Sequence, residues 1–139
     1  MAEVVLKGHG VAKGRAQGVA LVSQSSISFR GGVDEQSGLI VEKGHELEGT
    51  SISGKIFVFP VGKGSTVGSF QLLELRHNGK APKAIINLRA DPIVTIGAII
   101  SNIPLVDQLE QNPLEIIRTG DVVEVDADLG IVKVKRDSV

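Results

Sequence analysis

The sequence predicts an α/β domain in which a β-rich shell surrounds a central strand–helix–strand–helix unit. Short runs of Val, Ile and Leu bounded by glycine lie towards both ends of the chain, which is typical of strands. Two segments with helix-start signals lie between them and alternate with short apolar runs. At 139 residues the chain is long enough to bury one hydrophobic core and too short for two, so we expect a single domain over residues 1–139.

The first part of the chain is predicted to form short strands separated by glycine turns. We expect these strands at residues 3–7, 18–23, 39–41 and 55–59. The glycine-containing segments 31–32 and 35–38 are predicted as turns because glycine tolerates the backbone angles that turns require.

The middle of the chain is predicted to be helical, with one strand between two helices. The first helix follows Ser65 and ends near His77, where Asn-Gly is a typical stop signal. Asp91 is predicted to cap the second helix, which carries proline in its first turn and is expected to be buried because residues 93–100 are nearly all apolar. Residues 84–86 between the helices are predicted as a buried strand.

The last part of the chain predicts a β-hairpin. Residues 121–125 alternate between polar and apolar side chains, a turn follows at 128–130, and residues 131–134 form a second strand. The segment 105–109 fits either a strand or a helix.

Composition excludes several classes of function. With a formal net charge of −1 and no Trp or Tyr, the chain has neither the basic field nor the stacking residues that nucleic-acid binding uses. The absence of cysteine excludes disulfides and thiolate-bound metal centres from this chain. His9, His45 and His77 lack the spacing of metal ligands and are interpreted as structural or solvated. The N-terminus does not resemble a signal peptide and no apolar run is long enough to span a membrane, so we expect a cytoplasmic protein with no membrane partner.

The glycine-rich run at residues 62–69 (GKGSTVGS) is the main candidate for a functional site. It follows an apolar strand and leads into a helix, an order that presents backbone N–H groups and the positive end of a helix dipole to an anion. The glycines allow a ligand to approach the backbone closely, and Ser65 stands where the turn meets the helix. We therefore interpret the run as a small anion site centred on Ser65, with simple capping of the helix as the alternative.

Other glycine-rich motifs fit this run poorly. It lacks the spacing of a Walker P-loop and does not match the Gly-x-Ser-x-Gly elbow of serine hydrolases. A phosphohistidine carrier would need histidine beside the turn, where this chain has Ser65. A non-catalytic anion-binding module stays open as an alternative function.

Several motifs in register resemble the small subunit of aconitase X enzymes across nearly the whole chain. They lie at residues 27–34 (ISFRGGVD), 44–49 (GHELEG), 58–60 (VFP), 62–69, 78–82 (NGKAP) and 91–94 (DPIV). The resemblance implies the swivelling β/β/α domain of the aconitase superfamily. It also implies a hydro-lyase that is active only with a large subunit carrying an iron–sulfur cluster, expected to be 4Fe-4S, in a heterodimer or larger complex with the active site between the subunits.

The resemblance favours one branch of this family. Lys63, Thr66 and the His45-Glu46-Leu47 segment resemble the archaeal branch, which dehydrates (R)-5-phosphomevalonate to trans-anhydromevalonate 5-phosphate in isoprenoid biosynthesis by the mevalonate pathway. The alternative is the branch that dehydrates cis-3-hydroxy-L-proline. Ser26 departs from the family pattern, in which proline is expected, and Arg30 departs at a position expected to be apolar.

The resemblance also assigns roles within the turn. Ser65 would be the base that removes the proton α to the carboxylate, with its alkoxide stabilised by the N–H groups of Gly64, Ser65 and Thr66 and by the helix N-terminus. The residues expected to bind substrate are Gly62, Lys63, Gly64, Thr66, Ser28 and Arg30. For Lys63 the alternative is a solvated side chain, and for Ser28 and Arg30 it is a structural role in the adjacent glycine turn.

Overall fold

A computed structural model describes residues 2–64 and 67–136, which form eight strands and four helices. The strands are β1 (Ala2–Lys7), β2 (His9–Ala12), β3 (Arg15–Val22), β4 (Ile56–Phe59), β5 (Ala84–Asn87), β6 (Leu105–Asp107), β7 (Val122–Asp126) and β8 (Ile131–Arg136). The helices are α1 (Phe29–Gly32), α2 (Gly68–His77), α3 (Pro92–Ile100) and α4 (Pro113–Ile116). None of the helices among these residues is long and apolar enough to cross a membrane.

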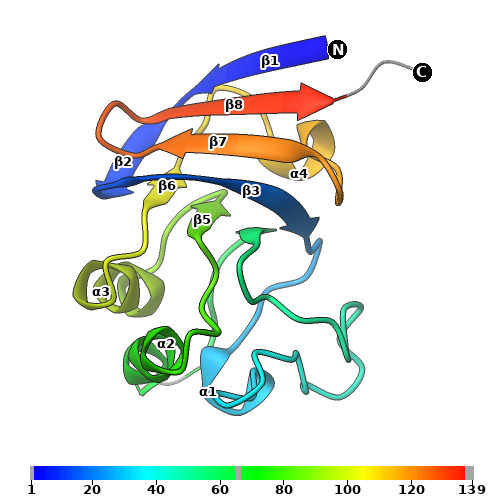
Figure 1. The fold of residues 1–139 in the computed structure, drawn as a ribbon, viewed down its shortest axis with the longest axis vertical. Helices are drawn as coiled ribbons and strands as arrows, with labels where there is room; N and C mark the ends of the chain where they lie inside the picture. The colour runs from blue at the N-terminus through cyan, green and yellow to red at the C-terminus, as the bar shows by residue number, and fades with distance from the viewer. Residues whose placement is uncertain (1, 65–66, 137–139) are drawn as a thin grey trace.

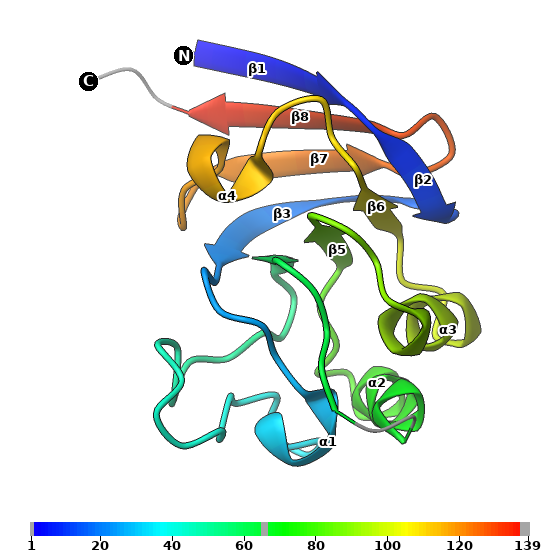
Figure 2. The ribbon, with the colours of Figure 1, turned by 180° about the vertical axis from the view of Figure 1, so that it is seen from behind.

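The strands form two layers that share strand β3. Their order is β1-β8-β7-β3-β4-β5-β6-β2, with β1, β8, β7 and the first part of β3 antiparallel, and with β3, β4, β5 and β6 parallel. Strand β3 pairs with β7 through Arg15–Val19 and with β4 through Ala20–Val22. Only Gly8 separates β1 from β2, so the chain passes from one end of the strand order to the other (Figure 2). The two layers therefore curve towards each other at both sides.

A helical layer covers the outer face of the parallel strands. Figure 1 shows β1, β8 and β7 on one side, the parallel strands in the middle, and α1, α2 and α3 on the other side. One hydrophobic core lies between the two strand layers and includes Leu6, Val58 and Val132. A second core includes Phe57 and residues of α2 and α3. The predicted β-rich shell with a central strand–helix–strand–helix unit is thus confirmed.

Three phenylalanines connect α1 to the parallel strands. The ring centroids of Phe29 and Phe59 lie 5.9 Å apart and those of Phe57 and Phe59 lie 4.6 Å apart. Aromatic pairs at such distances stabilise a core beyond the area that they bury. Phe29 therefore holds the segment 28–30 against the end of β4, immediately before the glycine-rich turn.

Helix α3 begins as predicted but is buried on one face only. The Asp91 carboxylate accepts hydrogen bonds from the N–H groups of Ile93 and Val94, as expected of an N-cap. Ile96 and Ile99 on the side away from the sheet are 53% and 54% exposed. The prediction of a wholly buried helix was wrong because α3 packs against α2, β2 and the core through one face, which carries Val94 and Ala98, and leaves the opposite face exposed.

Other elements differ from the prediction in instructive ways. Residues 39–41 do not form a strand. Ile40 bridges to Val33 and Leu39 bridges to Ser51, and all of these residues lie in the long loop between α1 and β4, so no continuous ladder forms. The predicted strand at 18–23 begins earlier, at Arg15. Within the segment 105–109, residues 105–107 form strand β6, whereas β2, α1 and α4 were not predicted. The hairpin, α2 and the strands at 3–7, 55–59 and 84–86 are confirmed within one residue at most boundaries.

An ion pair secures the end of the antiparallel layer. The Asp121 carboxylate accepts hydrogen bonds from Arg136 Nε at 2.9 Å and Nη2 at 2.6 Å, and from the Arg118 N–H at 2.8 Å. The hydrogen bonds from Arg136 hold the pKa of the Asp121 carboxyl below its ordinary value. The ionised carboxylate is therefore favoured by folding.

This ion pair predicts an acid-dependent contribution to stability. Because the folded-state pKa of Asp121 is lowered, its stabilising effect is present above the unfolded-state pKa of about 4 and is lost as pH falls through the folded-state pKa. The Asp121→Asn variant should be less stable than the native chain at pH 7, and the difference should shrink below about pH 4. Urea unfolding of both chains at the two pH values measures this, and an equal difference at both would contradict it.

Candidate functional site

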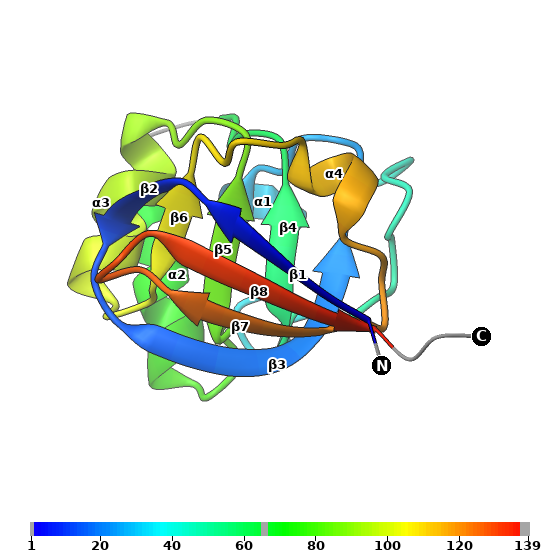
Figure 3. The same ribbon diagram turned by 90° about the horizontal axis from the view of Figure 1, so that it is seen from above.

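The candidate site lies where the parallel strands end. The arrowheads of β3, β4, β5 and β6 point towards the same edge of the sheet (Figure 3). Ligands of open α/β sheets bind at the carboxyl ends of the strands, in the loops that follow them. The glycine-rich turn is the loop after β4, and residues 23–28 and 88–91 follow β3 and β5, the two strands that flank β4.

Residues 62–64, the first part of the turn, are each held by a different neighbour. The Gly62 N–H donates to Asp91 Oδ1 at 2.9 Å, and the Lys63 N–H donates to the Ile27 carbonyl oxygen at 3.0 Å. Gly64 has φ = 101°, a conformation that favours glycine, and a Cβ added there would collide with Ser28 Oγ. The described part of the turn is therefore fixed on both sides before it reaches Ser65.

The two central residues of the predicted site, Ser65 and Thr66, lie outside the described residues. The structure describes the chain again from Val67, which is the N-cap of α2. The assignment of Ser65 as base or as helix cap, and that of Thr66 as a substrate contact, stay predictions.

The structure brings the other predicted residues to this edge. Ser28 adjoins Gly64, and its hydroxyl donates to the Arg30 carbonyl oxygen at 2.8 Å. A Cβ on Gly68 would lie 3.9 Å from the Arg30 backbone nitrogen, so the start of α2 approaches the same segment. Ser28, Arg30, Gly62, Lys63 and Gly64 thus share one corner, whereas their contacts with a substrate stay predictions.

Lys63 is paired with a residue that sequence reasoning missed. Its Nζ lies 3.0 Å from Glu42 Oε2, and the Lys63 side chain is 52% exposed. Glu42 belongs to the long loop between α1 and β4, where no local sequence signal marks it as a partner. In this structure the Lys63 side chain is therefore half-exposed and paired with the Glu42 carboxylate. An anionic ligand would compete with that carboxylate for the lysine.

Buried polar groups support the loops around the turn. His45 Nδ1 accepts a hydrogen bond from the Leu47 N–H at 3.0 Å, which assigns the ring proton to Nε2. Asn87 Nδ2 donates to the Phe59 carbonyl oxygen at 3.0 Å, and Asp107 Oδ2 accepts from the Ala90 N–H at 2.8 Å. His45 is thus structural, as one of the two interpretations held. Asn87 and Asp107, which hold the loops after β4 and β5, were not identified from the sequence.

The described residues offer no ready-made metal centre. Within the ranges 2–64 and 67–136, no three His, Asp or Glu side chains gather in a way that could hold a metal ion, and the chain has no cysteine. Among the described residues, the Ser28 hydroxyl and the half-exposed Lys63 ammonium group lie at this edge, while the N–H groups of Gly62 and Lys63 are already used within the fold.

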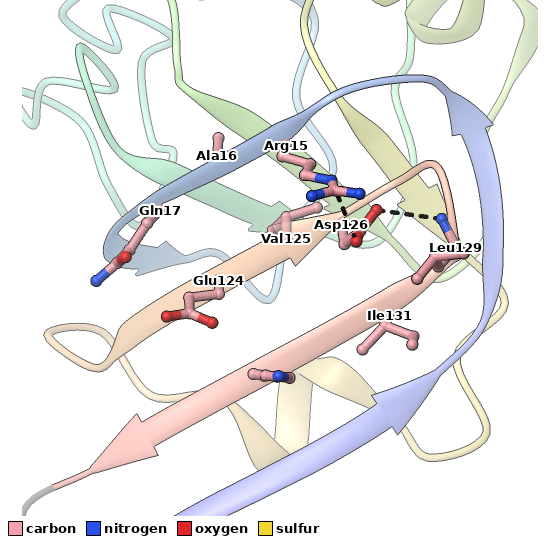
Figure 4. Close-up of a pocket in the computed structure, with 9 residues that line it drawn as sticks. Arg15, Ala16, Gln17, Glu124, Val125, Asp126, Leu129 and Ile131 are labelled. Carbon is pink, nitrogen blue, oxygen red and sulfur yellow. Dashed lines mark hydrogen bonds and ion pairs between the residues drawn. The ribbon is translucent and has the colours of Figure 1, made fainter.

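A separate hollow lies on the outer face of the antiparallel layer. Figure 4 shows Arg15 and Asp126 facing each other there, with Glu124 and Ile131 on the neighbouring strands. Arg15 Nε lies 3.3 Å from Asp126 Oδ2, so these charges satisfy each other. The hollow shares no residue with the glycine-rich turn or with the neighbours that hold it, and we do not assign it to the site.

Comparison with known proteins places this geometry in context. The family model of the aconitase X swivel domain matches residues 5–134. The phosphomevalonate dehydratase small subunit of Methanocella arvoryzae is 56% identical over 128 residues, covering 92% of this chain and 97% of that protein. The protein of the same name from Methanosarcina acetivorans is 52% identical over 133 residues, covering 96% and 92%. The crystal structure of Thermococcus kodakaraensis aconitase X in its holo-form matches with a TM-score of 0.91 and 47% identity, covering 96% of this chain and 99% of that one.

Proposed function

This chain belongs to the aconitase X swivel-domain family, and we propose that it is the small subunit of a phosphomevalonate dehydratase. The observation that carries the proposal is the identity of 56% with a relative of that name over nearly the whole of both chains. Family membership also confirms the fold expected from the motifs. The activity is that of a hydro-lyase, which removes water from (R)-5-phosphomevalonate to give trans-anhydromevalonate 5-phosphate.

The name of these relatives implies a second, large subunit. We propose that this subunit binds the iron–sulfur cluster, because this chain has no cysteine to ligate one. A cluster with an open iron site supplies a Lewis acid for the departing hydroxyl group. The carboxyl edge of the parallel strands would face the large subunit, with the substrate between them.

The part of this chain in the reaction is to remove a proton. We propose that Ser65 takes the proton α to the substrate carboxylate. A serine hydroxyl is a weak acid, so its alkoxide needs stabilisation from fixed N–H dipoles and from the N-terminus of α2. The turn supports this role because Asp91, Ile27 and Ser28 hold its preceding residues in place, which limits reorganisation during the reaction.

Reconstitution tests the proposed function. This chain and its large subunit, assembled anaerobically, should dehydrate (R)-5-phosphomevalonate and leave unphosphorylated mevalonate unchanged, while this chain alone should be inactive. Product formation is measured by chromatography with authentic standards. Turnover of cis-3-hydroxy-L-proline in place of phosphomevalonate would move the chain to the other branch of the family. Activity of the purified chain alone would contradict the two-subunit proposal.

The Ser65→Ala variant tests the assignment of the base. Loss of a general base lowers rates by about 10²–10⁴-fold, whereas loss of a helix cap costs only about 1 kcal/mol of stability. The variant complex should therefore assemble normally and lose kcat by about that factor. Ser37→Ala is the control, because the Ser37 hydroxyl donates to Asp34 and accepts from the Leu39 N–H in a loop segment that lies against Lys80, beyond the far end of α2. Near-normal kcat with a lower melting temperature would favour the capping role.

The Lys63–Glu42 pair tests the contact with the phosphate. Charge-assisted hydrogen bonds contribute about 1.5–3 kcal/mol, so Lys63→Ala should raise KM for phosphomevalonate by roughly tenfold or more. Glu42→Gln removes the counter-charge but keeps the side-chain size, so it should lower KM or leave it unchanged. Steady-state kinetics of both complexes measure this. An increase in KM with Glu42→Gln equal to that with Lys63→Ala would show that the pair is structural.

A further inference from the structure

Asp91 joins two elements that meet at the candidate site. It lies at the end of the loop after β5, where α3 begins. Its Oδ2 accepts hydrogen bonds from the N–H groups of Ile93 at 3.0 Å and Val94 at 3.2 Å, while its Oδ1 accepts from the Gly62 N–H at 2.9 Å. One carboxylate therefore caps a helix with one oxygen and holds the glycine-rich turn with the other.

The packing around Gly62 shows that this contact is closely fitted. A Cβ added to Gly62 would lie 2.5 Å from Val94 Cγ2 and 2.6 Å from Asp91 Oδ1. Real Cβ atoms do not approach other atoms so closely, so the turn can rest against α3 only because residue 62 has no side chain. The hydrogen bond and the missing side chain act at the same contact.

Asp91 is itself held in place by the strands below it. The Ala90 N–H donates to the buried Asp107 carboxylate at 2.8 Å, and the Leu88 N–H donates to the Pro60 carbonyl oxygen at 3.0 Å. The loop of residues 88–91 is thus fixed to β6 and to the residue that follows β4. Because Asp91 is fixed relative to the parallel strands, its hydrogen bond to Gly62 also fixes the turn relative to those strands.

We propose that Asp91 is a positioning residue for the reaction: its Oδ1 fixes Gly62, and through it the direction in which the turn carries its following residues towards the substrate. This inference rests on the proposed function, because it assigns the turn to catalysis. A misplacement of about 1 Å in a catalytic group can cost about 10²-fold in rate, so loss of this hydrogen bond should act on kcat.

The Asp91→Asn variant separates the two tasks of the carboxylate. Asparagine caps helices as well as aspartate does, so its single carbonyl oxygen can still accept from Ile93 and Val94. Its amide group would face Gly62 with a donor where an acceptor is required. The variant therefore keeps the helix cap and loses the hydrogen bond to the turn.

Asn112 provides the matched control. It precedes Pro113 as Asp91 precedes Pro92, and its side chain caps α4 by accepting from the Leu114 N–H at 2.9 Å. Asn112→Ala removes a cap of the same kind without touching the glycine-rich turn. An effect of Asp91→Asn that exceeds the effect of Asn112→Ala therefore reports the contact with Gly62 and not the loss of a helix cap.

Two measurements test the inference. Amide hydrogen exchange of the full chain should show faster exchange of Gly62 in Asp91→Asn, by about tenfold, with Ile93 and Val94 still protected. In the complex with the large subunit, kcat should fall by about 10–10²-fold while KM changes less than twofold, on whichever of the two substrates the native complex turns over. The Asn112→Ala complex should keep native kcat.

Three outcomes would overturn the inference. They are unchanged exchange at Gly62, faster exchange with native kcat, and an Asp91→Asn complex no slower than the Asn112→Ala complex. Failure of the proposed function has a different signature, namely a native complex that leaves phosphomevalonate intact. The exchange measurement is independent of that result, so the two failures can be told apart.

Discussion

Strand β4 is buried along its whole length, with Ile56 and Val58 in the core between the strand layers and Phe57 and Phe59 in the core under the helices. A strand covered on both faces has one position in the sheet, because a shift by one residue would exchange the side chains of the two cores. Its parallel pairing with β3 and β5 then fixes where the chain leaves the sheet. The glycine-rich turn begins at that point, so its location follows from the packing of four apolar residues.

The conformation of the turn depends on close packing of its glycines against neighbouring residues as much as on hydrogen bonds. Gly62 rests against α3 and Gly64 rests against Ser28, and both contacts lack room for a side chain. Glycine in such positions costs conformational entropy on folding, since it has more freedom in the unfolded chain than other residues have. The cores beneath the turn offset that cost. The result is a backbone segment held between two parts of the chain that are distant in sequence.

Local signals in the sequence predicted the elements whose determinants are local. Asp91 with Pro92 marked the start of α3, and alternating residues marked the hairpin of β7 and β8. The apolar run at 39–41 was wrongly predicted as a strand. It forms only isolated bridges to other residues of its own loop, and the sequence of the run does not show which residues it pairs with. Periodicity likewise could not show that Ile96 and Ile99 face away from the sheet, since an all-apolar helix has no polar face to reveal its orientation. The glycine-rich turn was found from its composition. Its contacts with Asp91 and Glu42 could not be predicted, because they connect residues far apart in the chain and no local sequence pattern indicates them.

Helices α3 and α4 begin with the same local sequence pattern, but their capping residues make different contacts with the rest of the fold. Asp91-Pro92 and Asn112-Pro113 both cap a helix with an acceptor side chain followed by proline. At α4 the asparagine oxygen meets only the first turn of its own helix, and that helix is a single short turn beside the strands. At α3 the aspartate has a second oxygen, and the fold brings Gly62 within its reach. A carboxylate has two acceptor atoms where an amide has one, so aspartate at this position can serve the helix and the turn at the same time. The choice of Asp over Asn at residue 91 is therefore explained by the turn and not by the helix.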